Sequence, residues 1–268
     1  MSDVNTNLTI VPHLSKETIS VLTKIHWEMD DQADLLYKMI GKSSVDNNQV
    51  LAFFRNRISE LQKSIKASLE IYARTFTVGR WALEVTNLDS AIITKFLDDI
   101  IVDESRTPEE LWSYAGLILN EPDTKKQVYN VSLKHMCVEI GRIFVKDTSY
   151  KNNFYTELYL RDYLRRTNLN KEGAYATLAK QSLSSYVVDP KKEQSIANKA
   201  IYEKGLLPEN RISVQSQRYA VKIFLAHWHA VAYRDLFHKD YVSHHKNIVP
   251  VPRWPFDKSN IIDIKVSD

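Results

Sequence analysis

Two groups of basic residues in the second half of the chain are candidates for chemistry with a polyanion. The first group contains Arg161, Arg165, Arg166 and Lys171, and the second contains Arg211, Arg218 and Lys222. Spacings of seven and four in the second group place its side chains on one face of a helix. A basic face with tyrosine and tryptophan nearby could follow a nucleic-acid backbone. Alternatively, these are solvated faces that pair with acidic residues, or cations that complement a helix dipole.

The histidines near the C-terminus do not make a metal site by their spacing. His227 and His229 are two residues apart, so on a helix they point about 200° away from each other. His238, His244 and His245 follow downstream, with no cysteine and only Asp235 and Asp240 nearby to complete a tetrahedral set. The single cysteine, Cys137, lies in an apolar segment and predicts a buried thiol. We therefore expect no metal, no cofactor and no catalytic residue.

The first 75 residues predict a helical hairpin. Ser15 is a suitable N-cap for a helix that Gly41 would end, and a second helix is expected from about 47 to 75. Apolar residues recur at helical spacing in both segments. They are Ile19, Leu22, Ile25, Met29, Leu35, Leu36, Met39 and Ile40 in the first, and Val50, Phe53, Phe54, Ile58, Leu61, Ile65, Leu69 and Tyr72 in the second. Such a hairpin is typical of a structural or oligomerising element.

The remaining chain also predicts helices. Thr107, Pro108 and Glu110 form the pattern of a capping box with proline at the first helical position, and Gly116 should end that short helix. Later helices are expected at 128–146, 151–167, 171–186, 190–204 and 211–237. From His244 onward, prolines predict an extended tail. The expected fold is all-α, divided into 1–75, 76–168 and 169–268.

Composition and charge agree with a helical, non-membrane protein. The chain has 268 residues, 44% of them hydrophobic and 26% charged, with only 6 Gly and 8 Pro. It has neither an apolar run of membrane-spanning length nor a secretory signal, so we expect a cytoplasmic location. Residues 1–125 carry a balance of −6 and residues 126–268 a balance of +9. This asymmetry indicates two faces with different partners, or two halves that attract each other.

The middle of the chain resembles a group of insertion-sequence transposases. The resemblance rests on Val78-Gly79-Arg80-Trp81-Ala82-Leu83-Glu84-Val85-Thr86-Asn87-Leu88-Asp89-Ser90-Ala91-Ile92-Ile93, on Trp112-Ser113-Tyr114-Ala115-Gly116-Leu117, and on Asn130-Val131-Ser132-Leu133-Lys134. These enzymes join an N-terminal RuvC-like nuclease to a C-terminal helix-hairpin-helix region. The similarity covers about residues 70–165 and implies a helix-hairpin-helix in this part of the chain.

The chain departs from that family at the positions that would bind DNA and catalyse. A Gly-apolar-Gly turn holds phosphate in a helix-hairpin-helix, whereas Asn87, Leu88 and Asp89 stand here. Residues 84–110 contain eight Asp and Glu against two Lys and Arg, a balance that repels a polyanion. No strand-borne carboxylates precede this region, and no serine lies between Gly116 and Asn130. The resemblance therefore implies a degenerate hairpin without transposase activity.

The sequence favours two functions over a third, an enzyme with an unrecognised site. The first is a non-catalytic, sequence-tolerant DNA-associated protein, related to a transposase C-terminal region and possibly encoded by a phage or mobile element. The second is an interaction or scaffold protein that uses the acidic residues 84–110 and the helical hairpin, possibly as a homo-oligomer, without nucleic acid. A steep loss of affinity with salt distinguishes the first from the second.

Overall fold

The computed structural model describes residues 15–40, 42, 45–103, 106–118, 129–146 and 154–238, except the side chains of 45–47. Every regular element within these ranges is a helix, which confirms the all-α prediction there. The predicted extended tail, His244, His245 and Gly41 lie outside the described residues. None of the described helices is both long and apolar enough to cross a lipid bilayer.

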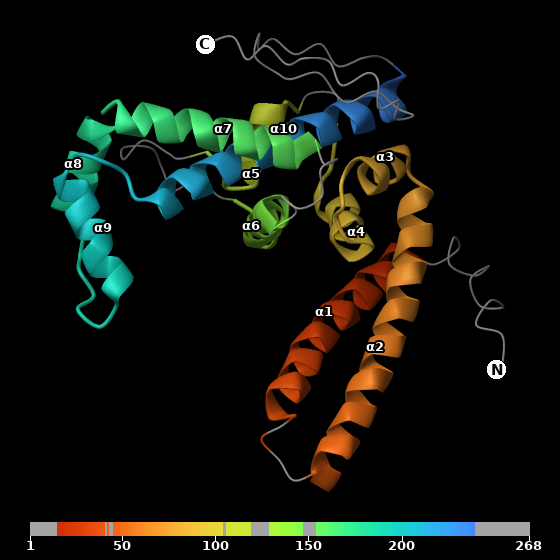
Figure 1. Ribbon diagram of the computed structural model, residues 1–268. Coiled ribbons are helices and arrows are strands. Elements are labelled where there is room, and N and C mark those ends of the chain that lie inside the picture. The colour runs from red at the N-terminus through yellow and green to blue at the C-terminus, as the bar shows by residue number, and fades with distance from the viewer. Residues whose placement is uncertain are drawn as a thin grey trace. The chain divides into compact units, whose positions relative to one another are not determined.

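The described helices are ten in number (Figure 1). Their bounds are α1 Lys16–Met39, α2 Val45–Arg74, α3 Thr77–Val85, α4 Ser90–Asp99, α5 Pro108–Tyr114, α6 Val131–Lys146, α7 Phe154–Lys171, α8 Ala176–Ser184, α9 Glu193–Glu203 and α10 Glu209–Phe237. Their contacts divide the chain into two compact units. The first contains the described part of residues 1–106 together with 228–238, and the second contains the described part of 107–227.

Local signals in the sequence set several helix ends. The side chain of Ser15 accepts a hydrogen bond from the Thr18 amide, so it is the N-cap of α1. Thr107 and Glu110 form the reciprocal capping box that begins α5. This helix ends at Tyr114, and Gly116 has a φ of +65°, a left-handed conformation that glycine adopts at little cost. These predictions are confirmed.

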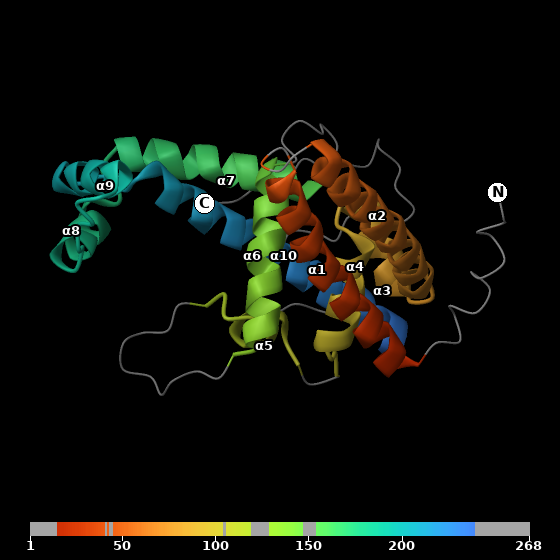
Figure 2. The ribbon, with the colours of Figure 1, turned by 90° about the horizontal axis from the view of Figure 1, so that it is seen from below.

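Helices α1 and α2 form an antiparallel hairpin in the first unit (Figure 1), and they lie side by side in the orthogonal view as well (Figure 2). The end of the hairpin near α4 has a core of Ile19, Ile65, Leu69 and Ala91. Two side chains of α4 also bond to the α2 backbone. The Ser90 hydroxyl donates to the Lys66 carbonyl at 2.9 Å, and the Thr94 hydroxyl donates to the Leu69 carbonyl at 3.3 Å. One end of the hairpin is therefore fixed to α4.

The second unit has its own aromatic core. Tyr155 of α7 is completely buried between Phe144 of α6 and Phe224 of α10, with ring centroids 5.3 Å away in both cases. Its hydroxyl lies 2.9 Å from His227 Nδ1, and burial raises the pKa of Tyr155 well above its usual value. A smaller cluster of Ala179, Tyr202, Leu207 and Ile212 holds α8, α9 and the start of α10 together. This unit thus has a dense interior beneath the predicted basic residues.

The packing of α3 against the end of α2 predicts an effect of substituting Gly79. A Cβ atom at this position would lie 2.1 Å from the carbonyl oxygen of Ala73, which is backbone and cannot turn aside. We expect Gly79→Ala to lower the free energy of unfolding by about 1–3 kcal/mol, measured by urea denaturation. Gly141→Ala is the control, because its nearest neighbours are side-chain atoms of Gln217 at 3.1 Å and 3.3 Å. An equal or smaller effect at Gly79 would contradict this account.

Candidate interaction surface

The three predicted arginines of α7 pair with carboxylates of the same helix. Asp162 is buried, with 4% of its side chain exposed, and it pairs with both neighbouring arginines. Arg165 approaches one carboxylate oxygen to 2.7 Å and Arg166 approaches the other to 2.5 Å. Arg161 lies 3.9 Å from Glu157 in an exposed pair, and Lys171 is in the last turn, where it complements the helix dipole. The structure therefore assigns these arginines contacts within the protein.

Arg211 of α10 is also used inside the second unit. Its guanidinium bonds to the hydroxyl of Ser182 on α8 and lies 3.2 Å from the hydroxyl of Tyr202 on α9. The same group lies over the ring of Tyr202, 5.9 Å from the centroid. Arg211 thus joins three helices, which is a packing role sufficient to explain its presence.

The other predicted cations of α10 form a positive cluster with Arg166. Lys222 lies over the Trp112 ring at 5.5 Å, and the Trp112 indole N–H donates to the Lys222 carbonyl at 2.8 Å. Burial of Lys222, together with the charges of Arg218 and Arg166, lowers the pKa of Lys222. Arg218 and Arg166 are therefore both near enough to Lys222 for their charges to oppose protonation of its amine, while Arg166 also pairs with Asp162.

The predicted degenerate hairpin lies between α3 and α4. Asp89 is the N-cap of α4, where its carboxylate accepts a hydrogen bond from the Ala91 amide at 2.9 Å and pairs with Lys66 at 2.5 Å. Leu88 is buried, and Asn87 lines an open hollow of about 360 Å³ beside α2. The protein's own carboxylate thus occupies the helix N-terminus at which a phosphate would bind.

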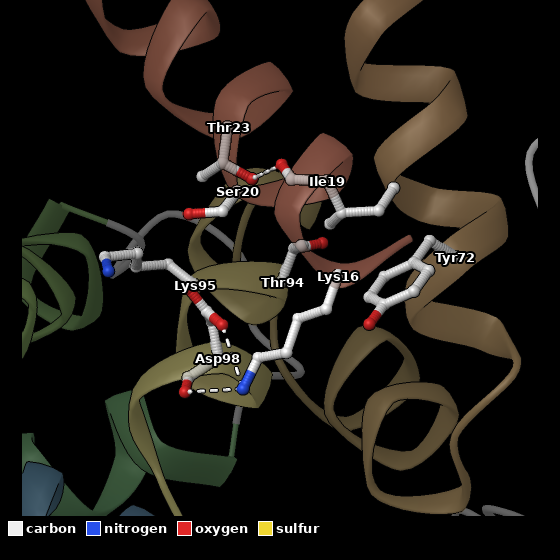
Figure 3. Close-up of a pocket in the computed structure, with 8 residues that line it drawn as sticks. All are labelled: Lys16, Ile19, Ser20, Thr23, Tyr72, Thr94, Lys95 and Asp98. Atoms are coloured by element: carbon white, nitrogen blue, oxygen red, sulfur yellow. Dashed lines mark hydrogen bonds and ion pairs between the residues drawn. The ribbon is translucent and has the colours of Figure 1, made fainter. Parts of the chain in front are cut away.

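Three carboxylates of the acidic segment 84–110, in addition to Asp89, pair with basic residues of the first unit. Asp98 pairs with Lys16 at 3.1 Å, Asp99 pairs with Lys95 at 2.8 Å, and Glu84 lies 3.6 Å from Arg74. The Lys16–Asp98 pair borders a cavity of about 10 Å³ at the end of the hairpin near α4 (Figure 3). That volume admits about one water molecule, so this cavity is too small for an organic ligand.

The reactive side chains noted in the sequence have structural contacts. His227 lies against Tyr155, as described above, and His229 Nε2 lies 2.7 Å from the Arg106 carbonyl oxygen. Cys137 is buried, and burial raises the pKa of its thiol to about 12, so it is not a thiolate at neutral pH. The described residues contain no group of three or more ligand side chains that could hold a metal ion.

The helical hairpin presents a surface of a different kind. Along the inner side of each helix runs a row of partly or fully buried residues spaced by three, four or seven positions, which we call the closed seam. Its members are Ile19, Leu22, His26, Met29, Ala33 and Leu36 on α1, and Leu51, Ile58, Gln62, Ile65 and Leu69 on α2. Across this seam, the Gln62 side-chain amide donates to Asp30 at 2.6 Å. The closed seam is where α1 and α2 pack against each other.

A second row with the same heptad character is exposed, and we call it the open seam. Its members are Val21, Glu28, Gln32, Leu35 and Met39 on α1, and Val50, Phe54, Arg57, Leu61 and Ser64 on α2. Eight of its ten members lie one position before a closed-seam residue, about 100° around the helix, and Met39 and Phe54 continue the same rows. Because α1 and α2 are antiparallel and face each other, this equal offset places both rows on one side of the hairpin. Its six apolar side chains are each 44–56% exposed.

Phe54, the aromatic member of the open seam, packs against its neighbour Phe53. Phe53 packs edge-on against Phe54 with ring centroids 5.6 Å apart. The Arg57 guanidinium lies 5.3 Å from the Phe53 centroid and pairs with Glu60 at 2.8 Å. The sequence had placed Val50, Phe53, Phe54 and Leu61 on a single stripe with residues that prove buried. The sequence signal that distinguishes these exposed residues from the buried ones is the width of the apolar stripe. One neighbouring helix cannot cover both the closed seam and the open seam.

Comparisons of the chain with protein-family models, with curated proteins and with solved structures give no match.

The buried carboxylate of Asp162 leads to a stability prediction. We expect Asp162→Asn to lower the free energy of unfolding by about 2–4 kcal/mol, because two arginines lose the charge that neutralises them in a partly buried setting. The control is Arg161→Gln, which removes an exposed ion pair and should change stability by less than about 1 kcal/mol. Urea denaturation of the two variants measures both values, and a similar small change in each would refute the structural role of Asp162.

Proposed function

We propose that this protein is an interaction protein that binds its partner through the open seam of the α1–α2 hairpin. The observation that carries the proposal is the exposed heptad row shared by two helices that are already packed together along another row. The six apolar side chains, of which Phe54 is the one aromatic, are each about half exposed and together leave a few hundred Å² of apolar surface open. The largest apolar patch of a typical monomer has about this size and is often functional.

The arrangement of the hairpin favours a role in binding a partner over a role only in packing within this protein. Only Ile19, Thr23 and His26 are buried among the 24 residues of α1. All three lie in the half of α1 near α4, whereas Leu35, Met39, Val50 and Phe54 lie toward the other end. Long helices gain most of their stability by packing an apolar face. The outer half of this hairpin therefore has a face suited to a partner.

The acidic segment is a weaker candidate for the docking surface. Several of its carboxylates already pair with Lys16, Lys66, Arg74 and Lys95 of the same unit. A basic partner would have to displace these cations, and the exchange of one exposed ion pair for another contributes little free energy. Of the two docking surfaces in the interaction hypothesis, the geometry therefore favours the helical hairpin over the acidic segment 84–110.

Oxidation of Met39 tests whether the open seam is covered in the cell. Methionine oxidises according to its exposure, and Met39 is 44% exposed. We expect hydrogen peroxide to oxidise Met39 severalfold more slowly in the native cells than in dilute purified protein, as measured by mass spectrometry. Val187→Met supplies an exposed reference in the second unit, since Val187 is 88% exposed. Equal Met39 rates relative to this reference would refute the proposal.

A second candidate function is supported by the cluster of Arg166, Arg218 and Lys222. Burial, together with the charges of Arg218 and Arg166, lowers the pKa of Lys222, so an added anion would stabilise its protonated form. Trp112 lies beside the cluster and offers an aromatic face. These features support backbone-directed, sequence-tolerant contact with nucleic acid through three of the seven predicted residues.

Fluorescence anisotropy with a labelled random oligonucleotide tests this second candidate. We expect binding at about 50 mM salt that weakens by an order of magnitude or more at about 200 mM, because bound phosphates release counterions. Arg218→Glu with Lys222→Glu should abolish the binding. The control, Lys180→Glu with Lys199→Glu, changes the net charge equally on α8 and α9. Equal losses in both double variants, or no binding at the lower salt, would exclude a specific nucleic-acid face at the cluster.

A further inference from the structure

The cations around Lys222 lie among partly exposed aromatic side chains. We propose that this face of the second unit binds single-stranded nucleic acid in preference to a duplex, with its cations on phosphates and the rings of Trp112 and Tyr219 against bases. The inference rests on the second candidate function, contact of this face with nucleic acid, and names the class of ligand that the face fits. Its five residues, which we call the mixed face, are Trp112, Arg166, Arg218, Tyr219 and Lys222.

Three members of the mixed face lie close together on α10. Arg218 and Tyr219 precede Lys222 by four and three positions, so the three side chains are neighbours on the helix surface. Arg166 reaches the same strip from α7, since its guanidinium lies 3.4 Å from the side-chain oxygen of Gln215, one turn before Arg218 and Tyr219. The mixed face is therefore a continuous strip along α10 rather than a set of scattered cations.

Each aromatic ring of the mixed face lies near a cation. The Lys222 amine is 5.5 Å from the centre of the Trp112 ring, and the indole N–H of Trp112 donates to the Lys222 carbonyl at 2.8 Å. Burial and Asp162 raise the pKa of Tyr219, and the charge of Arg166 opposes this rise, so the phenol is within electrostatic range of that guanidinium. The phosphate and the base of one nucleotide are joined by a single sugar. A phosphate held by Lys222 thus leaves its base beside Trp112.

The cations of the mixed face differ in how far the protein neutralises them. Arg166 pairs with the buried carboxylate of Asp162, whereas Arg218 and Lys222 form no ion pair with any residue that the structure describes. Burial and the charges of Arg218 and Arg166 lower the pKa of Lys222, and a bound phosphate would favour its protonated form. About two or three phosphates suffice to neutralise such a face, which is the footprint of a short stretch of one strand.

The setting of α10 disfavours its insertion into the groove of a duplex. A helix that reads the major groove projects from its protein and presents a whole face to the base edges. Here Ala220, Val221, Ile223 and Phe224 of the same stretch are buried. Helix α7 runs alongside α10 (Figure 1), and α5 contacts it through Trp112. A narrow strip remains accessible, against which unpaired bases can stack while the paired bases of a duplex cannot.

Fluorescence anisotropy with matched strands tests the preference. A labelled single strand of about 20 nucleotides that does not pair with itself is compared with the duplex that it forms with its complement, at about 50 mM salt. We expect the single strand to bind roughly tenfold more tightly, because stacking of one base contributes a factor of about this size. The logarithm of its affinity should fall with the logarithm of the salt concentration with a slope of about −2, since about three phosphates release counterions.

Paired substitutions at the rings separate base stacking from hydrogen bonding. Trp112→Phe and Trp112→Leu both remove the indole N–H that donates to Lys222, but only phenylalanine keeps an aromatic face. We expect Trp112→Leu to weaken single-strand binding roughly tenfold more than Trp112→Phe does, with equal duplex binding by the two variants. Tyr219→Leu and Tyr219→Phe provide the same comparison at the second ring. Circular dichroism checks that each variant is folded, and if a leucine variant unfolds, the affinity ratio of the wild type decides.

The outcomes that overturn the inference are distinguishable from failure of the function on which it rests. A duplex that binds as tightly as the single strand overturns the preference, while loss of that binding in Arg218→Glu with Lys222→Glu keeps the nucleic-acid face. Equal single-strand affinities of the leucine and phenylalanine variants at both rings overturn base stacking. Binding of neither form at about 50 mM salt removes the nucleic-acid face and this inference together. The open seam and its proposed function are unaffected by that result.

Discussion

The packing of α1 against α2 along the closed seam is the constraint on which the candidate surface depends. Ile19, Ile65 and Leu69 fix the end of this seam near α4, and Ser90 and Thr94 bind the α2 backbone there. Once this end is fixed, the heptad register determines which side of each helix remains uncovered. The open seam therefore follows from the closed seam, since eight of its ten members precede a closed-seam residue by one position.

Charged residues in this chain are used mostly to hold elements in place. Asp162 neutralises Arg165 and Arg166, while Asp89 caps α4 and pairs with Lys66. These contacts are short, and some of them involve a partly buried group. For such a group, removing one partner destabilises the fold by more than the intact pair stabilises it. Net charge over a segment consequently says little about the surface that it presents. The cluster around Lys222 is different because the charges of Arg218 and Arg166 oppose protonation of its amine.

The sequence predicted the helices well, because their signals are local. Ser15, Thr107 and Gly116 act at helix ends through contacts within a few residues, and the apolar periodicity marks the helices themselves. Which apolar residues are covered depends on contacts between distant segments. Leu61 and Ile65 are one turn apart on the same stripe, yet Leu61 is 48% exposed and Ile65 is 7% exposed. Likewise, the partner of Arg211 on α8 lies 29 residues away, beyond the reach of helical spacing.

The polar members of the open seam bear on what kind of interface it can form. A seam of leucine and phenylalanine alone would associate tightly and without a preferred register, whereas polar residues at core positions of coiled coils lower stability and specify orientation. Glu28 and Gln32 interrupt the row on α1, and Arg57 and Ser64 interrupt it on α2. Arg57 can keep its contact with the Phe53 ring while its charge faces a carboxylate of another helix. The composition of this seam is thus suited to a reversible and oriented association, because its apolar positions supply affinity and its charged positions select the helix that they face.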